Sequence, residues 1–191
     1  MEEKKMIING HEAVDLGLSV KWATCNIGAS RPEEYGDYFA WGETKPKDKY
    51  SYKNYMFYNA TNGSHLIHTG AIISGTKFDA VHKLWGEDWR MPTEWDLYEL
   101  LRECSWERAI INGGKGYRVI GPNGNCIFLP AEKWNPRYNE NEGVLYWTGS
   151  FSDDDSHWDA LCLCLDFDND EIYSTYVEPY DGLLIRPVTN K

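Results

Sequence analysis

Short strand-like runs alternate with turn sequences from residue 105 to residue 188, and this alternation constrains the fold more than any other feature. Asn112-Gly-Gly114 and Pro122-Asn-Gly124 are turn sequences, and each lies between two such runs. Runs joined by such tight turns pair in antiparallel fashion. We therefore predict small twisted antiparallel sheets. The expected strands are 106–111, 116–120, 126–129, one that begins at 146–147, 158–167, 172–177 and 183–188.

The run 158–167 is the longest expected strand. Successive side chains of a strand point to opposite faces, so Leu161, Leu163 and Leu165 share one face while Cys162 and Cys164 share the other. The five cysteines are an odd number and contain no C-x-x-C spacing, which argues against a disulfide framework. We interpret the two cysteines of this strand as buried free thiols that act as small apolar side chains.

Two segments have the apolar spacing of amphipathic helices. The first covers residues 78–85 and is closed by Gly86, a favourable C-terminal cap. The second covers residues 94–104 and follows Thr93, a favourable N-cap. Helices early in the chain and antiparallel strands later indicate the fold class α+β.

The domain organisation is simple. Residues 1–12 are interpreted as a tail and residues 13–190 as a single domain. Strands near 13–25 and 183–188 are expected to pair and so to bring the two ends together. Residues 43–76 are polar and Tyr-rich, and we expect a long irregular insertion there, which often has a functional reason. Shorter strands are expected at 14–17, 20–25 and 38–41.

Acidic residues are concentrated near the C-terminal end. The net charge is −11, and residues 138–185 hold 12 Asp and Glu with no Lys or Arg. Nucleic acids are bound through basic stripes, so we expect no nucleic-acid partner. No apolar run approaches the roughly 20 residues of a membrane helix, so we expect no membrane insertion. The acidic excess fits a solvated surface, or a surface for cations, basic proteins or neutral ligands.

Seven blocks of sequence, spread from residue 13 to residue 188, resemble a known family when taken in order. They are Ala13–Ala29, Tyr35–Glu43, Trp89–Thr93, Lys115–Tyr117, Ile127–Ala131, Tyr146-Trp147 and Ile185–Val188. They resemble the major paralogous domain family of gut and rumen bacteria, which is similar to C-type lectins in the branch of the formylglycine-generating enzymes. The resemblance implies a C-type-lectin-like fold, with two helices flanking small twisted sheets and paired N- and C-terminal strands. We interpret six tryptophans of the scaffold as core residues: Trp22, Trp41, Trp85, Trp89, Trp95 and Trp147.

The same branch contains the variable proteins of diversity-generating retroelements, which display ligand-binding residues between a Tyr-Trp pair and a closing Arg-Pro-Val. The resemblance therefore implies a variable ligand-binding segment at 146–188. Mutagenesis of adenines in Asn codons reaches Asn, Asp, Tyr, Ser and His among others, but not Trp, so Trp158 would be an unvaried aromatic anchor. The candidate ligand-binding residues are Asp153, Asp154, Asp155, His157, Trp158, Asp168, Asn169, Asp170, Tyr173, Tyr176, Tyr180 and Asp181.

No cofactor is expected, with calcium as the alternative. Calcium takes six to eight oxygen ligands, and Asp166, Asp168 and Asp170 would share one face if the strand continued to them. Asp153–Asp155 could supply further oxygens. Glu178-Pro-Tyr180 matches the Glu-Pro-Asn sugar motif of lectins at two positions only. An unpaired acidic face is the commoner arrangement.

We expect a non-catalytic domain that binds a protein or a glycan on a cell surface. One alternative is a fixed surface adhesin or pilus-tip subunit. Another is a formylglycine-generating-enzyme-like oxidoreductase, which would use Cys162 and Cys164, yet no adjacent base or cation activates a nucleophile. The first residues lack the apolar core of a secretory signal, which suits a phage tail protein or a surface protein whose leader was removed.

Overall fold

The computed structural model describes residues 5–58, 71–131, 143–152 and 159–191. These residues form mostly short strands, with two α-helices and one 3₁₀ turn. The strands are β1 (Met6–Ile8), β2 (His11–Val14), β3 (Lys21–Ala23), β4 (Ser105–Ile111), β5 (Gly114–Ile120), β6 (Cys126–Pro130), β7 (Val144–Phe151), β8 (Ala160–Asp166), β9 (Glu171–Val177) and β10 (Val188–Thr189). The helices are η1 (Tyr52–Asn54), α1 (Ala80–Trp85) and α2 (Glu94–Glu103).

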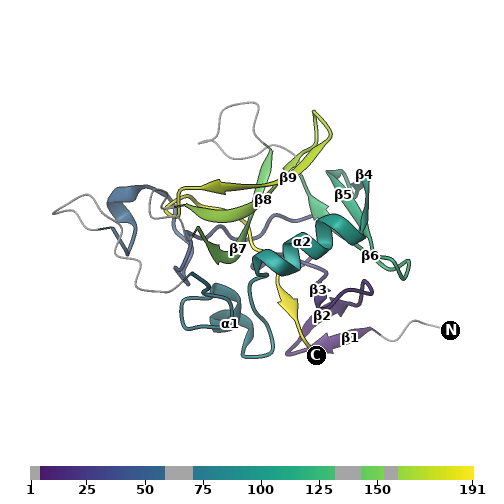
Figure 1. The fold of residues 1–191 in the computed structure, drawn as a ribbon, viewed down its shortest axis with the longest axis horizontal. Helices are drawn as coiled ribbons and strands as arrows, with labels where there is room; N and C mark the ends of the chain where they lie inside the picture. Colours follow the sequence, from purple (N-terminus) through teal and green to yellow (C-terminus); the bar gives the residue numbers. More distant parts are fainter. Residues whose placement is uncertain (1–4, 59–70, 132–142, 153–158) are drawn as a thin grey trace.

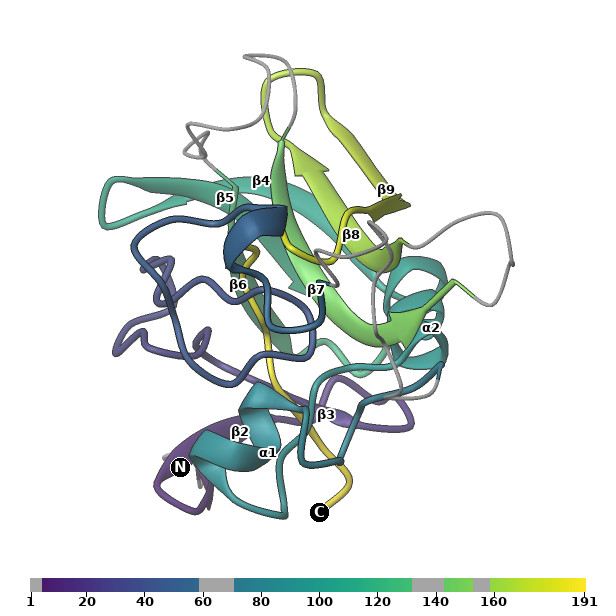
Figure 2. The same ribbon diagram turned by 90° about the vertical axis from the view of Figure 1, so that its left-hand side faces the viewer.

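The strands of the described residues form three sheets (Figures 1 and 2). The first has the order β1-β2-β3-β10 and so combines strands from both ends of the chain. The second is β4-β5-β6 and the third is β7-β8-β9, each built from strands that follow one another in sequence. All ladders between these strands are antiparallel. The prediction of small antiparallel sheets with two helices is confirmed.

The predicted pairing of early and late strands is also confirmed. Val188 pairs with Trp22 across β10 and β3. The late strand is shorter than the predicted 183–188, because Leu183 forms an isolated bridge with Phe39 instead. The strand predicted at 38–41 is therefore reduced to this single bridge at Phe39.

The N-terminal sheet begins inside the stretch that the sequence predicts to be a tail. Strands β1 and β2 form a hairpin around Asn9 and Gly10, whose φ angles are 48° and 83°. Two consecutive left-handed residues are what a tight hairpin turn needs, and Asn-Gly supplies them. The indole N–H of Trp89 donates to the carbonyl of Ile8 at 3.0 Å and holds the hairpin on the core. The prediction that residues 1–12 form a tail is therefore wrong for residues 6–12, which belong to the β1–β2 hairpin.

Both helices occur where they are predicted. In α2, Thr93 and Asp96 cap each other, because the side chain of each accepts the backbone N–H of the other. Helix α1 begins later than predicted, because Asp79 acts as its N-cap and accepts the N–H of Val81 at 2.8 Å. It ends at Gly86, as predicted. Within the described residues, no helix is long and apolar enough to cross a membrane.

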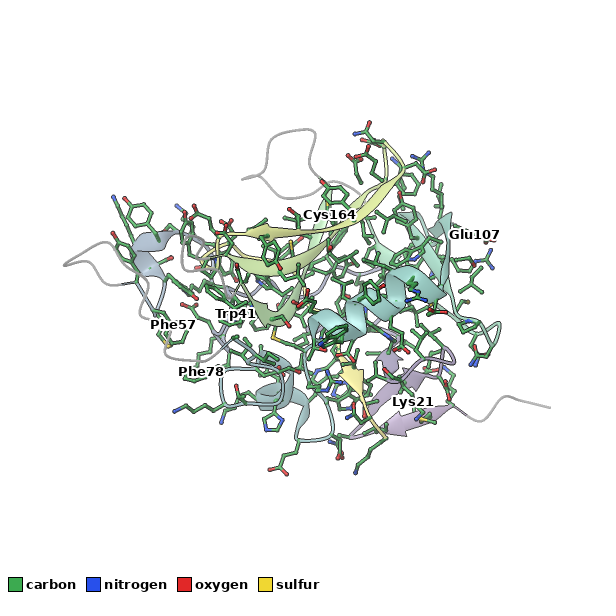
Figure 3. The ribbon with its side chains drawn as sticks, in the orientation of Figure 1. Lys21, Trp41, Phe57, Phe78, Glu107 and Cys164 are labelled. Atoms are coloured by element: carbon green, nitrogen blue, oxygen red, sulfur yellow. The ribbon has the colours of Figure 1, made fainter. Side chains whose placement is uncertain are left out.

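Strand β8 lies at the centre of the third sheet, and both of its faces are buried. Leu161, Leu163 and Leu165 enter one apolar cluster, while Cys162 and Cys164 enter another. The predicted alternation and the burial of these two free thiols are confirmed. The first cluster also contains Leu97, Leu100, Tyr117 and Val119, and the second contains Phe39, Trp41, Trp89 and Trp147. Trp41 and Cys164, which are labelled in Figure 3, are both buried.

Candidate ligand-binding surface

The predicted ligand-binding residues fall into separate places in the structure. Asp168, Asn169 and Asp170 lie in the turn between β8 and β9, Tyr173 and Tyr176 lie on β9, and Tyr180 and Asp181 lie in the turn after β9. Asp153, Asp154, Asp155, His157 and Trp158 lie outside the described residues.

Tyr173 and Tyr176 point to opposite faces of the edge strand β9. Tyr173 pairs with Cys164 and Tyr176 pairs with Leu161. Residues directly opposite each other in a ladder share a face, and Cys164 and Leu161 belong to different core clusters. The two side chains are 42% and 49% exposed. They therefore do not form one flat surface, although the sequence analysis groups them.

The turn between β8 and β9 is held by its own polar groups. The Asp166 carboxylate accepts the backbone N–H groups of Asp168 and Asn169 at 3.0 Å each, and the Asn169 amide at 2.7 Å. Arg108 of β4 pairs with Asp170 at 3.0 Å and donates to the Asp168 carbonyl at 3.1 Å. The polar side chains of this turn thus fasten it to the second sheet.

The same contacts weaken the calcium alternative. Asp166, Asp168 and Asp170 would share one face if the strand continued to them, but β8 ends at Asp166 and the other two lie in the turn. Asp166 already accepts three hydrogen bonds. Among the described residues, no group of three or more His, Cys, Asp and Glu side chains is placed to hold a metal ion.

Tyr180 packs against the insertion predicted from residue 43. Its ring centroid lies 6.2 Å from that of Tyr52 and 6.5 Å from that of Tyr55, with the rings edge to face. The Tyr55 hydroxyl donates to the Trp41 carbonyl at 2.8 Å, and the backbone N–H of Trp41 donates to the Pro179 carbonyl at 2.8 Å. The insertion and the turn after β9 therefore form one continuous surface. We call Tyr52, Glu178, Tyr180 and Asp181 the insertion surface.

The described part of the insertion is irregular in backbone but tightly fixed. The ring of Tyr50 lies against Gly182, where an added Cβ would come within 2.4 Å of a ring carbon. The Tyr50 hydroxyl donates to the Tyr38 carbonyl. The buried Glu43 carboxylate accepts the N–H of Met56 at 2.7 Å. These contacts hold the loop in place as a platform whose one regular element is the short helix η1 in its described part.

The insertion surface carries two carboxylates, Glu178 and Asp181, and its Tyr52 ring has the Lys53 ammonium 5.7 Å from its centroid. The pKa of Glu178 is raised, first because the carboxyl is partly removed from water and then because Asp181 and Asp159 repel its charge. A ligand that brings hydrogen-bond donors or positive charge would relieve this repulsion. The part of the surface around Glu178 and Asp181 therefore disfavours additional negative charge.

The buried cysteines do not favour nucleophilic chemistry. Burial raises the pKa of the Cys162 thiol far above its ordinary value, and the neighbouring Cys164 and Asp181 raise it further. The thiolate is the reactive form of cysteine, so a raised pKa makes this side chain inert.

Two exposed aromatic residues on α2 are missed by the sequence analysis. Trp95, expected in the core, is 75% exposed, and Tyr98 is 51% exposed. Their exposure could have been predicted from the helical spacing. Leu97 and Leu100 face the core, so Trp95 and Tyr98 lie on the outer face of the helix.

Comparisons of the chain with protein-family models, with curated proteins and with solved structures each gave no match. The function is therefore argued from the residues and the geometry described above.

Proposed function

We propose that the chain is a non-catalytic ligand-binding domain of C-type-lectin-like fold, and that it binds a protein or a glycan on a cell surface through the insertion surface. The observation that carries the proposal is the fixed packing of Tyr180 against Tyr52 and Tyr55. Tyrosine gives rigid contact area at a low entropic cost, and the neighbouring Glu178 and Asp181 add hydrogen-bonding groups.

The fold assignment rests on the architecture together with the sequence blocks. Two helices, small antiparallel sheets and a pairing between β3 and β10 suit the layout that the family resemblance implies. The landmarks of the resemblance are structural, since Tyr146, Trp147 and Arg186 are buried. Buried landmarks would keep the scaffold constant while exposed positions between them vary.

Diversification of residues 146–188 is the finer part of the proposal. Tyr173 and Tyr176 are exposed positions within it, and Cys162 and Cys164 are buried ones. We expect sequencing of this coding region across one natural population to show substitutions at adenine positions of the exposed codons, with an unvarying template repeat nearby. An invariant segment would favour the fixed adhesin instead.

Binding itself is tested with the fluorescently labelled chain on intact bacterial cells and on a printed glycan array. Tyr52→Ala and Tyr180→Ala should each reduce binding at least tenfold while the melting temperature changes little. Ile110→Ala removes a more exposed apolar side chain from β4, away from this surface, and should leave binding unchanged. Undiminished binding by a folded Tyr52→Ala/Tyr180→Ala double variant would overturn the assignment to this surface.

A further inference from the structure

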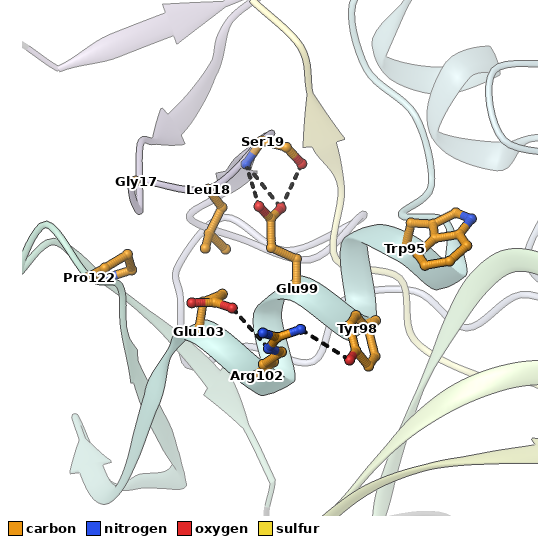
Figure 4. Close-up of a pocket in the computed structure, with 9 residues that line it drawn as sticks. All are labelled: Gly17, Leu18, Ser19, Trp95, Tyr98, Glu99, Arg102, Glu103 and Pro122. Atoms are coloured by element: carbon orange, nitrogen blue, oxygen red, sulfur yellow. Dashed lines mark hydrogen bonds and ion pairs between the residues drawn. The ribbon is translucent and has the colours of Figure 1, made fainter.

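An open groove runs along the outer side of α2, well separated in sequence from the insertion surface. Its volume is about 450 Å³. Trp95, Tyr98 and Arg102 line it from the helix, at the i, i+3 and i+7 spacing that places side chains on one face. Leu18 and Pro122 line it from two turns (Figure 4). We call this feature the α2 groove.

The polar groups of the α2 groove are largely paired with one another. Both carboxylate oxygens of Glu99 accept hydrogen bonds from Ser19, at 2.6 to 3.1 Å. Arg102 donates to the Tyr98 hydroxyl at 3.3 Å and pairs with Glu103 at 3.2 Å. The groove therefore has few polar groups left for a ligand rich in hydroxyls. It presents instead the apolar faces of its aromatic rings.

Trp95 is the most exposed of the large apolar side chains among the described residues, at 75%. Its indole N–H has no hydrogen-bond partner in the described part of the chain, so it is one directional donor that the groove offers. A ligand with a carbonyl beside an apolar ring would use both the donor and the ring face.

The two aromatic rings form a corner. The centroids of Trp95 and Tyr98 are 6.4 Å apart and their planes meet at 82°. A corner of two ring faces fits a compact, puckered apolar ring better than one flat stacking plane does.

The length of the groove can be compared with that of an extended peptide. From Trp95 to Arg102 the helix rises about 10 Å, and one three-residue turn of polyproline II rises about 9 Å. A single turn of that helix thus matches the length of the aromatic and cationic stripe.

Charge favours a basic neighbour for the apolar ligand. Two carboxylates, Glu99 and Glu103, line the α2 groove together with one cation, Arg102, so the lining carries one negative charge in excess. Arg102 itself lies over the Tyr98 ring, 5.9 Å from its centroid. The aromatic rings of this surface can therefore make cation–π contacts with guanidinium groups. A segment with an arginine next to its prolines would therefore be complementary in charge.

We propose that the α2 groove binds an extended proline-rich peptide segment flanked by basic residues. Proline rings would fill the corner between Trp95 and Tyr98, and the Trp95 indole would donate to a peptide carbonyl. Proline-rich segments are already extended before binding, so they lose little entropy in a shallow groove. This binding is a second activity and does not depend on the insertion surface.

The test is titration of the ¹⁵N-labelled full chain with a synthetic peptide of consecutive prolines that carries two arginines at one end. We expect the Trp95 indole signal to shift in proportion to occupancy, and Trp95→Ala to weaken binding at least tenfold. Ile110→Ala is the matched control and should bind normally. Tyr52→Ala should also bind the peptide normally, which separates this result from the proposed function.

Four outcomes would overturn the inference. The Trp95 signal could stay in place at millimolar peptide, or Trp95→Ala could bind as well as the unaltered chain. A Gly-Ser peptide with the same two arginines could bind equally, which would leave charge alone as the cause. An oligosaccharide such as maltohexaose that shifts the Trp95 signal where the proline peptide does not would assign the groove to sugars and also contradict the proposal.

Discussion

The Arg186 guanidinium donates to the side-chain oxygen of Asn26 at 2.8 Å in the interior of the domain. Its other N–H groups donate to the carbonyls of Ala23, Thr24 and Phe128. No carboxylate pairs with it in the described residues. A buried cation satisfied by neutral oxygens joins the first strands, β6 and the C-terminal segment at one point, and burial lowers the pKa of this arginine.

Replacing Arg186 should therefore destabilise the fold strongly. Arg186→Met leaves several buried oxygens without donors, and each orphaned acceptor costs about 1–3 kcal/mol. We expect a loss of at least about 3 kcal/mol in the free energy of unfolding, measured by urea denaturation. Arg118→Met, which removes an exposed arginine paired with Glu107 at 3.3 Å, should change it by less than about 1 kcal/mol. A loss of similar size in both variants would contradict this account of Arg186.

Asp96 gives the fold a defined dependence on pH. Burial alone would raise the pKa of this carboxyl, but hydrogen bonds from Arg90 and Thr93 outweigh burial and lower the pKa below its ordinary 3.8. A lowered pKa in the folded state stabilises the protein above the unfolded pKa, and this contribution disappears as the pH falls through the folded pKa. Stability should therefore decline below about pH 4.

The variant that tests this is Asp96→Asn. It keeps the size of the side chain but removes the charge that Arg90 pairs with at 2.6 Å. We expect it to be less stable than the unaltered chain at pH 7 by about 1–3 kcal/mol. The gap should narrow at pH 3, because the Asp96 carboxyl of the unfolded chain is then largely protonated and the charged folded form loses part of its advantage. A gap of constant size from pH 7 to pH 3 would show that Asp96 does not act through its charge.

Local signals made the secondary structure predictable. The N-cap at Thr93 and the alternating pattern of β8 each depend only on residues close together in the sequence, so both elements occur where the sequence predicts them. The opposite orientation of Tyr173 and Tyr176 was also readable, because a spacing of three in a strand changes the face.

The candidate surface was less predictable, because it depends on contacts between distant segments. Tyr180 contacts Tyr52 and Tyr55, which lie more than 120 residues earlier in the sequence. No local sequence pattern in either segment predicts this contact. The sequence predicts a ligand surface at Asp168–Asp170 because this segment lies between the landmarks of the family resemblance and consists of residue types that the mutagenesis reaches. Arg108, which fastens that turn, lies on another sheet.

The cysteines should react in an order set by burial. Cys126 is exposed and should be alkylated first by iodoacetamide in the native protein. Burial raises the pKa of Cys104 to about 11, so this thiol should react slowly. Cys162 and Cys164 should stay unmodified until the protein is unfolded. Mass spectrometry of peptides from a timed reaction measures this order, and rapid native labelling at either buried thiol would restore the oxidoreductase alternative.

The contact between Gly182 and Tyr50 should be an essential part of the insertion surface. In Gly182→Ala the new methyl group would lie 2.4 Å from a Tyr50 ring carbon, so the ring must move and release the loop. Overpacking of this kind costs about 1–3 kcal/mol, and ligand binding should fall as the platform loosens. Tyr50→Ala also loses packing by itself, but it removes the clash. In the Tyr50→Ala background, Gly182→Ala should therefore cost little further stability, which a double-mutant cycle measures. Simple additivity of the two losses would mean that Tyr50 does not fix the loop through Gly182.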